Sequence, residues 1–99
     1  MVKIVWTEIS RNDLKEIFDF IAEDSQRYAS ITVNKIYQRA QDIIDNPFVG
    51  RIVPEFNNKI IREIISGNYR IVYKIVTDFQ VDILRVYHSA RLLTNDKLI

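Results

Sequence analysis

The hydrophobic positions at the start of the chain follow one short extended pattern and then a helical one. Residues 2–6 (VKIVW) are rich in β-branched side chains and predict a short strand. Ser10 followed by Asp13 resembles a capping box, which predicts that a helix begins there. The apolar residues that follow recur at helical spacing: Leu14, Ile17, Phe18 and Ile21. The segment therefore predicts an amphipathic helix.

A second helical pattern follows a polar break at residues 23–26 (EDSQ). Its apolar stripe is long: Ala29, Val33, Ile36, Tyr37, Ala40, Ile43 and Ile44. Asn46-Pro47 ends this pattern, because the residue before a proline is pushed out of the helical region. Two helices joined by so short a turn predict an antiparallel helical hairpin.

After residue 48 the pattern becomes that of strands. Residues 48–58 (FVGRIVPEFNN) predict a loop, and three strand-like runs follow it: residues 59–65, 69–76 and 81–88. The connections between these runs are of hairpin length, and Gly67 can supply the positive φ of a tight turn. The runs therefore predict an antiparallel meander.

The order of these elements, β-α-α-β-β-β, indicates an α+β fold within a single domain over residues 1–99. We expect a helical hairpin packed on one face of a small twisted, mainly antiparallel sheet. The N-terminal strand is expected to pair along one edge of the meander.

Helices on one face of the sheet leave the other face open. Alternation along residues 69–76 separates Arg70 and Lys74 from a mostly apolar set, and we expect the apolar set to pack on the helices. Arg70 and Lys74 are expected to look outward, with Arg62 as a further candidate for that face. Alternation in the last strand groups Val81, Ile83, Arg85 and Tyr87 against Asp82, Leu84, Val86 and His88. It leaves open whether Arg85 or His88 joins the outward basic face.

Composition narrows the class of protein. The chain has no cysteine, which excludes disulfides, zinc–thiolate sites and thiol nucleophiles. No apolar run approaches the roughly 20 residues that span a bilayer. The N-terminus also lacks a signal-peptide pattern. We therefore expect a cytoplasmic protein without a membrane partner.

The net charge of +1 hides an asymmetry along the chain. Residues 1–50 carry an excess of Asp and Glu, whereas residues 51–99 carry an excess of Lys and Arg. Five basic residues of the second half are arginines: Arg51, Arg62, Arg70, Arg85 and Arg91. Such an asymmetry suits a partner that carries phosphates or carboxylates.

The chain shows no glycine-rich phosphate loop, serine-nucleophile motif or metal-ligand spacing, so no cofactor is expected. Its remaining chemistry consists of basic side chains, tyrosines and one histidine. Such a set could cleave RNA without a metal, with His88 as base or acid and Arg62 and Arg70 clamping the phosphate. Alternatively, the histidine is a packing residue and the arginines pair with acids such as Glu63 or Asp82. The residues alone leave both readings open.

Four stretches of the chain, in this order, resemble the RelE/ParE toxin superfamily of type II toxin–antitoxin systems: DLKEIFDFIAEDS, NPFVGRIVPEF, IREIISGNYRIVYKI and ILRVYHSARLL. The resemblance extends from Trp6 to Leu93. It implies a small toxin, neutralised by a cognate antitoxin whose partly disordered segment folds over the helices and sheet. The target would be DNA gyrase in ParE-like members, or mRNA on the ribosome in RelE-like members.

The resemblance also implies roles for individual residues. Arg70 matches the strand arginine with which ribonuclease members stabilise the transition state, and His88 stands where several of them have a catalytic His or Lys. Arg62 would complete this catalytic set. The other basic candidates for binding a nucleic acid or protein target are Lys59, Lys74, Arg85 and Arg91.

Two departures from the nuclease pattern distinguish these alternatives. Glu63 follows Arg62 where ribonuclease members carry paired lysines, and Leu92-Leu93 stand where many of them have a tyrosine. The chain thus resembles the ParE-like, plasmid-stabilisation branch more closely. We expect a toxin that binds an essential target such as DNA gyrase, with a RelE-like mRNA endonuclease as the alternative.

Overall fold

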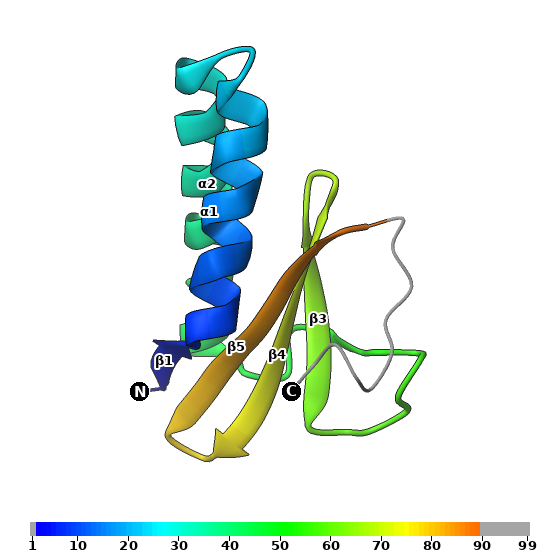
Figure 1. Ribbon diagram of the computed structural model, residues 1–99. Coiled ribbons are helices and arrows are strands. Elements are labelled where there is room, and N and C mark those ends of the chain that lie inside the picture. The colour runs from blue at the N-terminus through cyan, green and yellow to red at the C-terminus, as the bar shows by residue number, and fades with distance from the viewer. Residues whose placement is uncertain (1, 90–99) are drawn as a thin grey trace.

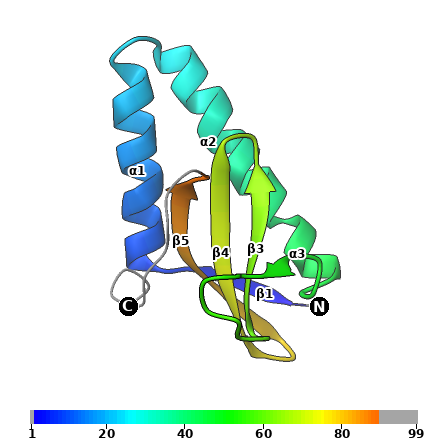
Figure 2. The same cartoon turned by 90° about the vertical axis from the view of Figure 1, so that its right-hand side faces the viewer.

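The computed structural model describes residues 2–89. Its elements are, in chain order, β1 (Lys3–Trp6), α1 (Glu8–Ala22), α2 (Gln26–Ala40), α3 (Asp42–Asp45), β2 (Arg51–Ile52), β3 (Ile61–Ser66), β4 (Tyr69–Thr77) and β5 (Gln80–His88). The strands form one sheet in the spatial order β1-β5-β4-β3-β2, in which β1 is parallel to β5 and the other pairs are antiparallel. The hairpin of α1 and α2 packs on one face of this sheet (Figure 1, Figure 2). The predicted α+β order is confirmed, and β2 is a short additional strand.

The first helix begins one turn earlier than the sequence predicted. Thr7 is the N-cap of α1, because its side-chain oxygen accepts a hydrogen bond from the Ser10 N–H at 3.1 Å. The same hydroxyl donates to the Ile83 carbonyl of β5 at 2.8 Å. The capping box predicted at Ser10 and Asp13 is therefore wrong, and both residues are buried within α1.

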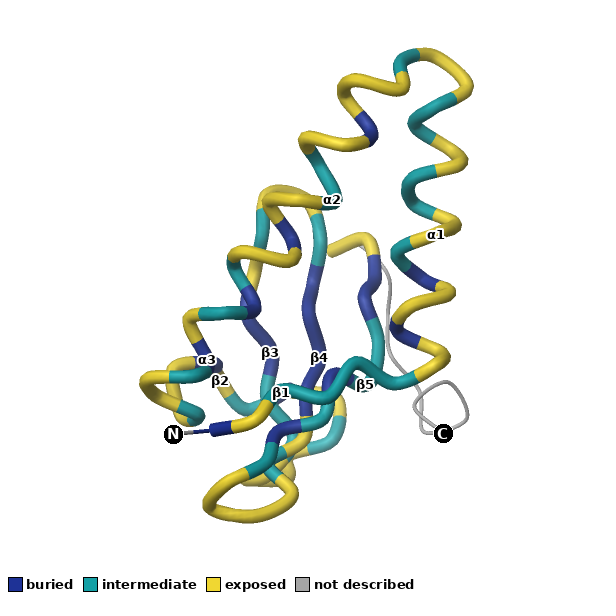
Figure 3. Tube along the Cα trace, turned by 90° about the vertical axis from the view of Figure 1, so that its left-hand side faces the viewer, coloured by how far each residue is buried: buried dark blue, intermediate teal, exposed yellow. Residues whose placement is uncertain are grey.

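The helical hairpin buries a narrow stripe. The buried residues of α2 and α3 are Ala29, Ile36, Ala40 and Ile43, all of them in the predicted stripe. Tyr37 belongs to the same predicted stripe but is 50% exposed, and its ring stacks on Trp6 of β1 at a centroid distance of 5.8 Å. The end of the hairpin farthest from the sheet carries few buried residues (Figure 3).

Apolar side chains cover both faces of the sheet. The larger cluster lies between the sheet and the helices and includes Ile36, Ala40, Ile43, Ile64, Ile71, Tyr73, Val81, Ile83 and Val86. A smaller cluster is formed by Val53, Val72 and Tyr87, with Phe56 and Ile61 packed against it. Because Val72 lies between Ile71 and Tyr73 on β4, this second cluster lies on the sheet face away from the helices, here called the outer face.

A bulge in β5 changes which of its residues share a face. Tyr73 pairs with Ile83 and Val72 pairs with Arg85, so the ladder skips Leu84. The alternation predicted for residues 81–88 therefore breaks after Ile83. Val81 and Ile83 face the helices, whereas Arg85 and Tyr87 lie on the outer face.

The register also corrects the position of Arg62. Arg62 pairs with Tyr73, which belongs to the helix-side core, so Arg62 lies on the helix side of the sheet. Arg70 pairs with Tyr87 and lies on the outer face, as predicted. Arg62 and Arg70 therefore extend from opposite faces.

Tyr73 fixes the loop that precedes β2. Its buried hydroxyl accepts a hydrogen bond from Gly50 N–H at 2.9 Å and donates one to the Pro47 carbonyl at 2.7 Å. A Cβ at position 50 would lie 2.6 Å from this hydroxyl and 2.6 Å from the Glu63 carbonyl oxygen, so the approach requires glycine. The loop is thereby held against the helix-side core.

We expect Tyr73→Phe to lower the free energy of unfolding by about 2 kcal/mol at neutral pH, because it leaves a buried N–H without its acceptor. Burial raises the pKa of Tyr73 above its usual value of about 10. The folded chain therefore keeps this phenol neutral. Its contribution to the free energy of unfolding is complete below about pH 10 and falls as the pH rises further. Urea denaturation at pH 7 and pH 10.5 should show a smaller alkaline loss for Tyr73→Phe than for the parent. Tyr37→Phe, at a half-exposed position, is the control, and an equal alkaline loss in Tyr73→Phe and the parent would contradict the assignment.

Candidate functional site

The outer face carries a buried network of ion pairs centred on Arg70. The Arg70 side chain is 6% exposed and that of Glu63 is 0% exposed, and Arg70 Nε donates to Glu63 Oε2 at 2.6 Å. Both terminal nitrogens of Arg70 donate to the Glu55 carboxylate, at 3.0 and 3.1 Å. Arg51 on β2 donates to the other Glu63 oxygen, Oε1, at 2.7 Å. Two carboxylates thus surround the guanidinium of Arg70.

These contacts fix the charge state of the network. The hydrogen bond to Glu55 is the largest influence on Arg70 and raises its pKa, while burial lowers it and Glu63 raises it further. The net direction is upward, so Arg70 stays a cation. Its charge is balanced by carboxylates in contact with it, and its hydrogen-bonding directions toward Glu55 and Glu63 are occupied. A phosphate would have to displace Glu55 to be bound by both terminal nitrogens.

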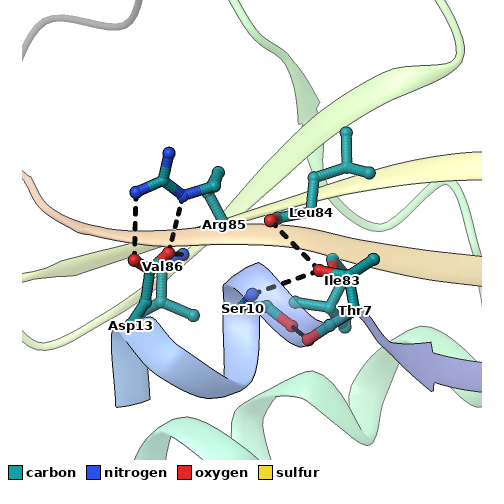
Figure 4. Close-up of polar contacts among 7 residues, drawn as sticks. All are labelled: Thr7, Ser10, Asp13, Ile83, Leu84, Arg85 and Val86. Atoms are coloured by element: carbon teal, nitrogen blue, oxygen red, sulfur yellow. Dashed lines mark hydrogen bonds and ion pairs between the residues drawn. The ribbon is translucent and has the colours of Figure 1, made fainter. Parts of the chain in front are cut away.

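Arg85 connects the sheet to the first helix. Arg85 Nε and Nη2 donate to the two carboxylate oxygens of Asp13 at 2.8 and 3.0 Å, and the Val86 N–H donates to Asp13 Oδ2 at 2.9 Å (Figure 4). The hydrogen bond to Asp13 raises the pKa of Arg85 more than burial lowers it. The guanidinium carbon also lies 4.6 Å from the centroid of the Tyr87 ring. This target-binding candidate therefore joins α1 to β5.

Arg62 lies in a different environment from Arg70. Its guanidinium donates to the backbone carbonyls of Lys59 and Gly50, each at 3.0 Å. The guanidinium carbon lies 4.9 Å from the centroid of the Phe48 ring. These contacts hold the loops on either side of β2.

His88 is exposed at the end of β5 on the helix side. It pairs across the ladder with Tyr69, and the two rings meet edge to face at a centroid distance of 5.8 Å. Because Arg70 pairs with the preceding residue, Tyr87, the side chains of His88 and Arg70 lie on opposite faces of the sheet. His88 and Tyr69 line a cavity of about 270 Å³ beside α1, together with Ile17 and Phe20.

The structure therefore does not gather the predicted catalytic set at one place. Arg62 and His88 both lie on the helix side but on different neighbours of β4. Arg62 on β3 pairs with Tyr73 in the middle of β4, whereas His88 on β5 pairs with Tyr69 at its first residue. Arg70 lies on the outer face within its carboxylate network. In RNA cleavage the base, the acid and the cations must reach one phosphate, and these three side chains do not converge on one point.

The remaining basic candidates are dispersed. Lys74 is exposed on the outer face, where its cross-strand neighbour is Asp82. Lys59 is exposed in the loop before β3. Arg91 lies outside the described residues. Each described cation of the outer face thus has a carboxylate either in contact with it or opposite it on the neighbouring strand. These cations are Arg51, Arg70, Lys74 and Arg85.

Sequence reasoning named Glu63 and missed Glu55 and Asp13 as partners of the basic residues. The signal for Asp13 was weak, since a polar residue near a helix start is usually read as a cap. Glu55 lies in an irregular loop and leaves no periodic signal.

Within residues 2–89, no group of three or more His, Asp or Glu side chains could hold a metal ion. In the same range no helix is long and apolar enough to cross a membrane.

Comparison with known families identifies the class of protein. Residues 4–93 match the family described as the ParE toxin of type II toxin–antitoxin systems, parDE. The chain belongs to this ParE toxin family, and the predicted resemblance to RelE/ParE toxins is confirmed. No curated protein sequence matches the chain.

Two solved structures share the fold. The chromosomal ParDE toxin–antitoxin system from P. aeruginosa matches with a TM-score of 0.70 and 21% sequence identity, over 89% of this chain and 96% of that one. The toxin–antitoxin complex RelBE2 from Mycobacterium tuberculosis matches with a TM-score of 0.60 and 23% identity, over 88% and 96%. At these identities the likeness establishes the architecture.

Proposed function

We propose that the protein acts in the cytoplasm as a ParE-like toxin that binds an essential protein target, DNA gyrase, and does not cleave RNA. The observation that carries this proposal is the burial of Arg70 between Glu63 and Glu55. A nuclease that stabilises a phosphorane needs cations open to the phosphate as charge develops on it. In this chain the corresponding guanidinium is already neutralised.

We also propose a cognate antitoxin as the partner that neutralises the toxin. Membership of the ParE family supports such a partner. Both similar structures are of toxin–antitoxin systems or complexes, which is consistent with it. The apolar side chains exposed on the helices, such as Phe20 at 75% and Tyr28 at 61%, offer contact area for a protein chain.

Induction of the gene in bacterial cells tests the action directly. Gyrase poisoning predicts growth arrest, an SOS response and covalent gyrase–DNA complexes, with transcripts intact. The RelE-like alternative predicts new 5′ ends within codons of translated mRNA and no gyrase–DNA complexes. Normal growth after induction, with the folded protein present, would count against both actions.

His88→Ala separates the two mechanisms most cleanly, because the side chain is exposed and its removal leaves the buried network intact. We expect growth inhibition to change less than about twofold, since the proposed mechanism uses no general acid or base. A nuclease that depends on His88 would lose about 100-fold or more of its rate. The control is Ser89→Ala at the adjacent exposed position. Circular dichroism should show that both variants are folded, and a loss of toxicity in His88→Ala alone would contradict the proposal.

A further inference from the structure

The second helix carries a positive charge that the helix itself does not balance. α2 contains three basic residues and no Asp or Glu, whereas α1 contains four acidic residues and two basic ones. Arg27 and Lys35 of α2 are exposed, and within residues 2–89 neither of them forms an ion pair. Arg39 is the third basic residue, and its partner Asp42 is itself exposed. α2 therefore differs from the outer face, where each described cation has a carboxylate beside it.

The basic residues of α2 lie along one side of the helix. Arg27, Ile31, Lys35 and Arg39 follow one another at intervals of four residues, which places them in a row, here called the α2 strip. At about 1.5 Å per residue, Arg27 and Arg39 are separated by roughly 18 Å along the helix axis. Duplex DNA rises by about 3.4 Å per base pair, so this distance corresponds to roughly five base pairs. The α2 strip thus has the length of a contact with one DNA backbone.

A small pocket lies beside Lys35, between α2 and the turn that joins β3 to β4 (Figure 2). Its volume of about 140 Å³ is small beside the roughly 300 Å³ or more of pockets that enclose organic ligands, and it suits a single group such as a phosphate. Lys35 is the only charged residue in its lining. Thr32, Ser66 and Asn68 also line it and supply hydroxyl and amide donors. Within residues 2–89 none of these three side chains forms another hydrogen bond.

This combination of groups matches the way in which proteins contact DNA phosphates. Lys and Arg, together with the side chains of Ser, Thr and Asn, make most contacts to the phosphate backbone, and these contacts carry no base sequence. A second copy of the chain is a poor occupant, because it would bring two positively charged strips together. An acidic protein segment would usually bury apolar side chains as well, and the α2 strip offers only Ile31, which is 39% exposed.

We propose that the α2 strip binds the phosphate backbone of duplex DNA without reading its bases, with one phosphate in the pocket beside Lys35. Arg27 and Arg39 contact phosphates on either side of that one. Arg39 is able to do so because its ion pair with Asp42 is an exposed surface pair of the kind that contributes little to stability. This binding goes beyond the proposed action on gyrase and does not depend on it.

Fluorescence anisotropy with a labelled duplex of about 20 base pairs tests the binding. We expect a Kd of about 0.1 mM or below at about 50 mM salt. The logarithm of the association constant should fall with the logarithm of the salt concentration with a slope of about −2 to −3, because each of three contacted phosphates releases about 0.9 counterions. No binding up to about 1 mM protein, or a slope near zero, would overturn the proposal. Tighter binding of the single strand than of the duplex would also overturn it.

Lys35→Glu and Lys15→Glu form a matched pair, because both residues are exposed lysines and both changes alter the net charge equally. We expect Lys35→Glu to bind the duplex at least about tenfold more weakly at about 50 mM salt, with a salt slope smaller by about one. Lys15→Glu, on α1, should bind within about threefold of the parent. Equal losses in the two variants would mean that only the net charge matters, and would contradict the proposed site.

Thermal melts establish that the variants are folded, and Arg27→Glu takes the place of Lys35→Glu if the latter does not fold. A capped polyglutamate peptide is the competitor that distinguishes DNA from an acidic protein segment. We expect it to displace the duplex only when its carboxylates are at least about tenfold more concentrated than the phosphates. Displacement at equal concentrations of charge would identify an acidic protein segment as the occupant and overturn the proposal. None of these readouts depends on toxicity or on gyrase.

Discussion

Glu63→Gln should lower the free energy of unfolding by about 3 kcal/mol, because it leaves the buried guanidinium of Arg70 with only one of its two carboxylates. The Glu63 side chain is fully buried and accepts from Arg51 and Arg70 through separate oxygens. Glutamine keeps the volume but has one acceptor and no charge. Urea denaturation with linear extrapolation measures the loss. Glu23→Gln, at an exposed position at the end of α1, is the control.

A double variant distinguishes a broken ion pair from poor packing. Glu63→Leu with Arg70→Met replaces both buried charges by apolar groups of similar size, which is often neutral or stabilising. We expect the pair of changes to recover most of the stability lost in Glu63→Gln. Glu55 remains partly exposed in this variant and can be hydrated. If the double variant is as unstable as Glu63→Gln, the loss has a cause other than the uncompensated charge.

Asp13→Asn should cost about 3 kcal/mol and should loosen the contact between α1 and β5. Asp13 accepts three hydrogen bonds from β5, two from Arg85 and one from the Val86 backbone (Figure 4). An amide in its place offers one acceptor oxygen and turns an N–H toward a cation. Asp19→Asn, on the exposed side of the same helix, is the control and should change stability by less than about 0.5 kcal/mol.

Hydrogen exchange adds a local readout to the Asp13 measurement. The Val86 N–H should exchange faster in Asp13→Asn by more than the global loss of stability explains. An amide in the middle of β4 should follow only the global change. Uniform acceleration at both positions would mean that Asp13 stabilises the whole fold without a specific role at the α1–β5 contact.

The fold was predictable because its signals are local and periodic. The helical stripe that ends at Asn46-Pro47 and the short connections between the last strands determine the order of elements. The order of the elements and the lengths of their connections are compatible with only a few topologies. The parallel pairing of β1 with β5 is compatible with the predicted edge position. The start of α1 was misplaced because Ser10 and Asp13 mimic a cap that Thr7 provides.

The site was less predictable because its determinants are not periodic. The bulge at Leu84 moves Arg85 and Tyr87 to the outer face, and a bulge of this kind leaves no mark in a pattern of alternating residues. The sequence did suggest that Glu63 opposes phosphate binding. It could not show that Glu63 is fully buried, which changes the pair from a weak surface contact into a strong constraint on Arg70.

The contacts between α1 and β5 also determine when the chain can fold during its own synthesis. The Thr7 hydroxyl bonds to a carbonyl 76 residues later, and Asp13 meets Arg85 across 72 residues. The α1–α2 hairpin can form early, but β1 and the first turn of α1 have no partner until β5 leaves the ribosome exit tunnel. At roughly 5–20 residues per second, the N-terminal elements wait for seconds in an incomplete state. The order of synthesis therefore delays the complete fold until β5 has been translated.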